Sequence, residues 1–83
     1  MWFNCKDKLP NRDGTYFIVH RFNTHNVYGA AEFRKNLGKV IGLSEHEGES
    51  GFYDHDPEWG SFVTYPTAWK YIEKYRGDVN GEV

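Results

Sequence analysis

Two histidines, each flanked by acidic residues, are the first groups in this sequence that suggest chemistry. His46 stands in Glu45-His46-Glu47 and His55 in Asp54-His55-Asp56. Imidazole nitrogen and carboxylate oxygen both bind zinc and other divalent ions. Structural zinc sites, however, mostly use several cysteines or a tight helical spacing of histidines. We therefore predict no metal site and no cofactor, and keep metal binding through His46 and His55 as a second alternative.

Cys5, the only cysteine, would be a nucleophile if His20 or His25 lay beside it, because a thiolate needs a nearby proton acceptor. Nothing in the sequence places these residues together, and a small buried cysteine is the simpler interpretation. The chain also lacks a glycine-rich phosphate loop. We predict no catalytic residue and no enzymatic activity.

Charge is strongly segregated along the chain. Residues 1–40 carry seven Lys or Arg against three acids, whereas residues 41–60 carry six acids and no Lys or Arg. Residues 61–83 carry three Lys or Arg and three acids, so the whole chain has a net charge of -2. An acidic block of this kind is typical of a solvated loop or of a loop that binds a partner.

The acidic block combines its negative charge with aromatic residues, and aromatic anchors surrounded by charge are typical of protein interfaces. We predict that loop 44–59 binds another protein. The predicted partner-binding residues are Glu45, Glu47, Glu49, Phe52, Tyr53, Asp54, Asp56 and Trp59. The rival interpretation is that Phe52, Tyr53 and Trp59 complete the core.

The basic first half of the chain supports an alternative function, because cations follow phosphates and aromatic rings accept bases. The candidate cations of such a nucleic-acid-binding module are Lys6, Lys8, Arg12, Arg34, Lys35 and Lys39. Because the pI is near 6.0 and the acids are numerous, we do not expect nucleic acid to be the main partner.

The elements that must position these residues are mainly strands. Gly14–Phe22 is the longest apolar run, and because both of its faces are apolar we expect a central strand covered on both sides. A polar linker, 23–26, predicts a hairpin to the strand Val27–Arg34. We further expect a short strand at Lys39–Leu43 and a last strand at Trp59–Tyr65, with Phe52-Tyr53 as a short strand inside the acidic loop.

The C-terminal part predicts one amphipathic α-helix. Pro66 suits a first helical turn and Gly77 suits the position after a last one. Ala68, Ile72 and Tyr75 fall on one stripe, which we expect to pack on the sheet. The fold class predicted from the sequence is therefore α+β, an antiparallel sheet of four to five strands with one C-terminal helix on a face.

The length of 83 residues predicts a single domain at 1–77, followed by a disordered tail at 78–83. No apolar run approaches the roughly 20 residues of a membrane span, and no export signal is recognisable. With no possible internal disulfide, a reducing cytoplasm fits best. A thin core rich in aromatic residues also makes a homodimer possible.

Several short motifs resemble a known family. Trp2, Lys6-Asp7-Lys8-Leu9-Pro10, a glycine turn, a Tyr-x-Ile-Val strand and Thr67-Ala68-Trp69 are together similar to short phage and prophage proteins, the domain-of-unknown-function family 551. That family typically has His where Ala68 stands. The resemblance implies a phage accessory protein in the bacterial cytoplasm, and it brings no activity or site residue with it.

Overall fold

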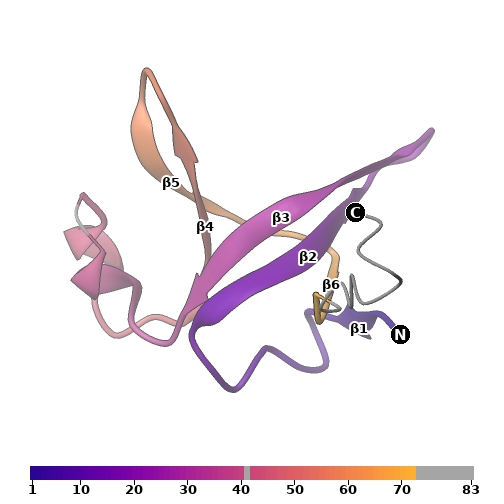
Figure 1. The fold of residues 1–83 in the computed structure, drawn as a ribbon, viewed down its shortest axis with the longest axis horizontal. Coiled ribbons are helices and arrows are strands. Elements are labelled where there is room, and N and C mark those ends of the chain that lie inside the picture. The colour runs from indigo at the N-terminus through magenta and orange to yellow at the C-terminus, as the bar shows by residue number, and fades with distance from the viewer. Residues whose placement is uncertain (41, 73–83) are drawn as a thin grey trace, which may run out of the picture.

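The chain folds into one antiparallel sheet of six strands (Figure 1). The computed structural model describes residues 1–40 and 42–72. The strands follow the spatial order β1-β6-β2-β3-β4-β5. Their bounds are β1 Phe3–Asn4, β2 Gly14–Arg21, β3 Asn26–Arg34, β4 Gly51–Asp56, β5 Gly60–Thr64 and β6 Ala68–Lys70, and two short 3-10 turns are η1 Leu37–Lys39 and η2 Ser44–His46.

The predicted central strand and its hairpin are confirmed. β2 pairs with β3 along its whole length and with β6 on its other edge, so it lies inside the sheet. Tyr16 and Ile18 point into the core from β2, and the amide of Phe22 donates to the carbonyl of His25 to close the hairpin at 2.9 Å. The prediction that this strand is covered on both faces is wrong, however, because Phe17 on the opposite face is 38% exposed.

The predicted C-terminal helix is wrong for the residues that the structure describes. Ala68–Lys70 form β6, and no α-helix occurs among residues 1–40 and 42–72, so the fold class is all-β and not α+β. In an extended backbone Trp69 points into the core, where it is fully buried, and Ala68 and Lys70 point outward. The backbone amide of Thr67 donates to the Val19 carbonyl at 2.8 Å, which starts the pairing with β2. The predicted helix beyond residue 72 and the predicted tail 78–83 lie outside the described residues.

The short strand predicted at Lys39–Leu43 is also wrong. The side-chain oxygen of Asn36 accepts from the amide of Gly38 at 3.0 Å and from that of Gly48 at 2.8 Å, which folds this segment into a compact double turn. Leu37 and Leu43 are buried inside the turn.

The core lies on one face of the sheet, hereafter the core face. Its buried residues are Tyr16, Ile18, Ala31, Phe33, Phe52 and Trp69. The sheet curls, because the ring nitrogen Nε2 of His20 on β2 lies 3.0 Å from the hydroxyl of Thr64 on β5. The opposite face, hereafter the outer face, carries Phe17, Tyr28 and Lys70.

The β4–β5 hairpin diverges from the β2–β3 hairpin (Figure 1). The register explains the divergence, because β3 pairs with β4 only over Glu32–Arg34 and Gly51–Tyr53. The remainder of β4 pairs with β5 alone and ends in a projecting turn. At the other end of the sheet, β1 pairs with β6, so the N-terminal segment forms the edge of the sheet on that side. Within the described residues, no helix has the length and apolar character needed to cross a membrane.

Candidate functional site

The eight predicted partner-binding residues occupy three different places in the structure. The first place is the start of β4, where packing within the sheet keeps Phe52 and Tyr53 from acting as anchors. Phe52 is 2% exposed and packs against the rings of Phe33 and Tyr16, with ring centroids 5.2 Å and 6.4 Å away. It faces inward because β4 places it opposite Phe33 on the core face. For Phe52 the rival interpretation, that the aromatic residues of the loop complete the core, is correct.

Tyr53 is the second residue of this group and is half-buried on the outer face. The guanidinium of Arg34 lies 5.9 Å from the centroid of its ring. A hydrogen bond with Tyr53 raises the pKa of Arg34, and the guanidinium also lies 3.8 Å from Asp13 and 3.9 Å from Glu32. Tyr53 therefore stabilises a local charge network at the pairing of β3 with β4.

The second place is the tip of the β4–β5 hairpin, where Trp59 is 83% exposed. One carboxylate oxygen of Asp56 accepts from the amide of Glu58 at 2.7 Å and from that of Trp59 at 3.0 Å. Gly60 has a φ of 85°, a conformation that residues with a side chain rarely adopt. The carboxylate and the glycine together fix the turn, so that it holds the Trp59 side chain away from the sheet.

The surroundings of Trp59 are acidic and aromatic. The carboxylates of Asp54 and Glu58 are exposed on the hairpin. Phe62 on β5, which lies opposite Asp54 in the register, is 45% exposed. Tyr65, directly after β5, is also exposed. The hairpin thus presents aromatic surface next to negative charge, whereas the Asp56 carboxylate is used in hydrogen bonds within the turn.

The third place is the η2 turn, which carries Glu45 and Glu47, with Glu49 following. All three side chains are exposed. The chain enters β4 directly after this turn, so these acids lie at the base of the hairpin whose tip carries Trp59 (Figure 1). Their place at the base is suited to long-range attraction of a basic partner, and the tip is suited to direct contact.

His46 lies between two of these acids. Its Nδ1 is 3.0 Å from Oε1 of Glu49, and its Nε2 is 3.8 Å from Oε1 of Glu45. His55 lies on β4, where its backbone amide donates to Asp54 at 2.8 Å. Over residues 1–40 and 42–72, no group of three or more His, Cys, Asp or Glu side chains is arranged to hold a metal ion.

Cys5 lies half-buried beside the core, where burial raises the pKa of its thiol to about 11. A thiol of this kind is neutral at physiological pH and is a poor nucleophile. The two histidines considered as its base have other partners. His20 contacts Thr64, and Nδ1 of His25 lies 2.9 Å from the hydroxyl of Thr24.

The basic residues considered for nucleic acid are divided between two regions. Arg34, Lys35 and Lys39 line one hollow of about 410 Å³, together with Asp13. Lys8 instead lies over the ring of Phe3, with its Nζ 4.7 Å from the centroid.

Sequence reasoning did not identify the exposed aromatic residues of the outer face. Trp2, Phe17 and Tyr28 lie there with Lys70. The alternation in β2 does place Phe17 opposite the core residues, but the predicted helix was expected to cover a face of the sheet. The alternation in β2 is therefore the sequence feature that indicates this aromatic surface.

Comparison of the chain with protein-family models, with curated proteins and with solved structures found no match.

Proposed function

We propose that this protein is a non-enzymatic accessory module that binds a partner protein through the β4–β5 hairpin, with Trp59 as the central anchor. The observation that carries the proposal is a tryptophan that is 83% exposed on a turn fixed by Asp56 and Gly60. The N-terminal resemblance to phage proteins supports a host or phage protein as the partner and the bacterial cytoplasm as the setting.

An exposed tryptophan is an unusually strong anchor when a partner buries it. Its side chain removes on the order of 150–250 Å² from water on burial, and tryptophan is enriched among the few residues that dominate binding energy. The Asp56 bonds to the amides of Glu58 and Trp59 hold the turn before any partner binds. A pre-formed turn loses little conformational freedom in the complex, so more of the contact energy appears as affinity.

The charges around the anchor define the complementary surface. Asp54 and Glu58 flank Trp59 with exposed carboxylates, and the η2 acids add negative charge at the base of the same hairpin. The fitting partner therefore has an apolar pocket with Lys or Arg at its rim. Such charge complementarity raises the rate of encounter and excludes acidic competitors.

β5 supports the same surface, because it is the outermost strand on its side of the sheet. Its sequence, Gly-Ser-Phe-Val-Thr, contains no charged residue and no proline, the devices that usually prevent pairing at an edge. Trp59, the residue directly before β5, is exposed. An extended segment of the partner can therefore pair with β5 while its neighbouring residues contact Trp59.

The test is capture from a bacterial lysate with three tagged baits: the wild type, Trp59→Ala and the matched control Tyr65→Ala. Tyr65 is exposed as Trp59 is but lies outside the fixed turn, so its replacement removes a ring without removing the anchor. We expect the same protein with the wild type and Tyr65→Ala, and its loss with Trp59→Ala. Equal capture by the Trp59→Ala bait would contradict the proposal, provided that the bait melts at the wild-type temperature.

A further inference from the structure

The outer face holds a hollow of about 350 Å³ formed by β2, β3, β6 and the residue before β1, at the opposite end of the molecule from the η2 acids. It is lined by Trp2, Phe17, Ile18, Tyr28, Gly29 and Lys70. Trp2 and Tyr28 border it with ring centroids 6.1 Å apart.

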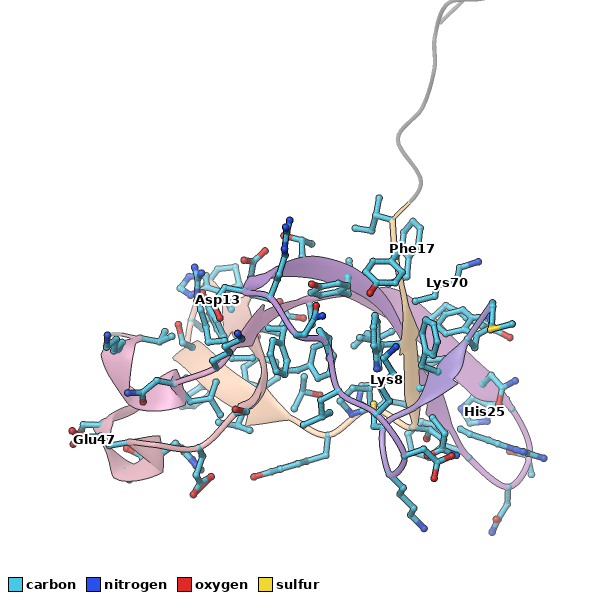
Figure 2. All side chains as sticks on the ribbon, turned by 90° about the horizontal axis from the view of Figure 1, so that it is seen from below. Lys8, Asp13, Phe17, His25, Glu47 and Lys70 are labelled. Carbon is cyan, nitrogen blue, oxygen red and sulfur yellow. The ribbon has the colours of Figure 1, made fainter. Side chains whose placement is uncertain are left out.

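A second hollow of about 360 Å³ lies next to the first and shares two residues with it. It is lined by Met1, Phe3, Phe17, Lys70 and Tyr71. Phe3 lies opposite the buried Trp69 in the register, so this hollow combines a ring of the core face with Phe17 and Lys70 of the outer face. Phe17 and Lys70 therefore form a ridge between two aromatic hollows, and Figure 2 shows these two side chains next to each other, far from Glu47. Nζ of Lys70 lies 5.0 Å from the Trp2 ring centroid and 5.8 Å from that of Phe17.

The same face continues to a basic hollow at its other end. Tyr53 and Arg34 belong to the outer face by their register, and the hollow that they line also contains Lys35 and Lys39. Asp13 is the one acid among its described lining residues, and it lies 3.8 Å from Arg34. The exposed amines of Lys35 and Lys39 remain as positive charge beside this ion pair.

We propose that the outer face binds single-stranded nucleic acid, with bases in the two hollows beside Phe17 and backbone phosphates at Lys70, Lys35 and Lys39. The exposed rings of Trp2, Phe17 and Tyr28 provide stacking surfaces, since every base has a face that can stack on an aromatic ring. A lysine between two such surfaces lies where the phosphate linking two stacked bases would be. This binding site does not include Trp59 or the tip of the β4–β5 hairpin.

The charge pattern distinguishes this ligand from an aromatic-binding peptide. Proline-rich peptides also dock on exposed aromatic residues, but Lys70 is the one charged side chain among the described lining residues of both hollows, and it favours an anion. Most of the exposed acids lie on η2 and on the β4–β5 hairpin. Glu32 does lie on the outer face, but it is 3.9 Å from the Arg34 guanidinium, which offsets its charge. The net charge of -2 therefore does not describe this face.

The test is fluorescence anisotropy with labelled oligo-dT and oligo-rU of about twelve nucleotides, at about 50 mM and 200 mM salt. We expect Phe17→Leu and Tyr28→Leu each to weaken binding by about 5- to 150-fold, the usual effect of losing one stacking ring. Lys70→Gln should lower the slope of log affinity against log salt by about 0.7, the value for one phosphate contact of a single strand. Tyr28 is 65% exposed, so its replacement tests stacking without disturbing the core.

Two matched variants serve as controls. Phe62→Leu removes an exposed ring from the other hairpin, and Arg12→Gln removes an exposed cation from the segment before β2. Both should bind as the wild type does, and so should Trp59→Ala, which separates this surface from the proposed protein-binding hairpin. The proposal is overturned if the wild type binds neither oligonucleotide, if all variants bind equally, or if Trp59→Ala alone loses binding.

Discussion

The indole nitrogen of Trp69 donates a hydrogen bond to the carbonyl oxygen of Lys8 at 2.8 Å, across a separation of 61 residues in the sequence. This bond joins β6 to the connection between β1 and β2. The ring centroid of Trp69 also lies 4.7 Å from that of Phe3 and 5.1 Å from that of Tyr16. A single side chain thus links the N-terminal segment, the central strand and the last described strand.

We predict that Trp69→Phe destabilises the protein strongly. The Lys8 carbonyl would lose its hydrogen bond, which is worth about 0.5–1.5 kcal/mol, and the smaller ring would leave a cavity in the core at an additional cost. Chemical denaturation measures the change in the free energy of unfolding. Ile72→Ala is the control and should cost less than about 1 kcal/mol, since Ile72 is 41% exposed and is not packed as the predicted helix required. Equal effects of both substitutions would contradict the role of Trp69.

A second prediction concerns the double turn between β3 and β4. A Cβ at Gly38 would lie 2.4 Å from the Cα of Glu47, a backbone atom that cannot move alone. Gly38→Ala should therefore destabilise the fold by about 1–3 kcal/mol, the usual cost of overpacking. Gly29→Ala is the matched control and should be neutral or slightly stabilising, because that position is open and its strand gains a better β-former. Thermal melting of both variants decides the matter.

A third prediction concerns the pH dependence of stability. The ordinary pKa of a cysteine thiol is 9.0, and burial raises that of Cys5 to about 11. Between these values the unfolded chain loses the thiol proton while the folded protein keeps it, so ionisation favours unfolding. The free energy of unfolding should therefore fall as pH rises from 9 to about 11, and Cys5→Ala should fall less over the same window. Identical pH profiles for the two proteins would contradict the burial of Cys5.

The same thiol should react slowly with iodoacetamide at neutral pH, because the thiolate is the reactive species. The control is the protein unfolded in denaturant, which should react at the rate of a free cysteine. Mass spectrometry of the labelled protein over time measures both rates.

A fourth prediction concerns the acids at the base of the hairpin. Glu45→Gln combined with Glu47→Gln should slow association with the partner protein and reduce its salt dependence, because both exposed charges contribute to steering. Dissociation should be almost unchanged, since neither residue lies at the hairpin tip. Asp7→Asn, which removes an exposed acid from the N-terminal segment, is the control and should leave the association rate as it is. Surface plasmon resonance separates the two rates.

The β2–β3 hairpin could be predicted because its pattern is local. Polar residues at 23–26 separate two strands whose inward residues alternate, and the register places Tyr16 opposite Ala31 as this alternation requires. β4 was anticipated only as a short strand at Phe52-Tyr53, because the acidic residues at its end do not resemble a strand. Its remaining residues are extended because β5 pairs with them.

The C-terminal error has a physical cause. Pro66 and the periodicity after it satisfy the rules for a helix. The segment Ala68-Trp69-Lys70 also fits a strand, because its one large apolar residue stands between two residues that can face outward. β2 has a second edge that needs partners, and pairing with it buries Trp69 completely, which outweighs local helix propensity. No window of the sequence contains this information, because β2 lies some fifty residues earlier in the chain.

The candidate site could be predicted only in part, because part of it depends on strand register and not on local sequence. Trp59 and the acids lie in one continuous segment, so composition was sufficient to select them. Whether each aromatic residue points inward depends on the register of β4 against β3, which places Phe52 opposite the buried Phe33. The outer-face residues Trp2, Phe17 and Lys70 come from three distant segments of the chain, and only the fold brings them together.

The most direct test of the proposed function is isothermal titration of the purified captured partner with three proteins: the wild type, Trp59→Ala and Tyr65→Ala. We predict that Trp59→Ala loses at least about 2 kcal/mol of binding free energy, which is about thirtyfold in Kd, because a central tryptophan anchor dominates such interfaces. Tyr65→Ala should change Kd by less than about threefold. An unchanged Kd for Trp59→Ala, in a protein that melts like the wild type, would contradict the proposal that Trp59 anchors the partner.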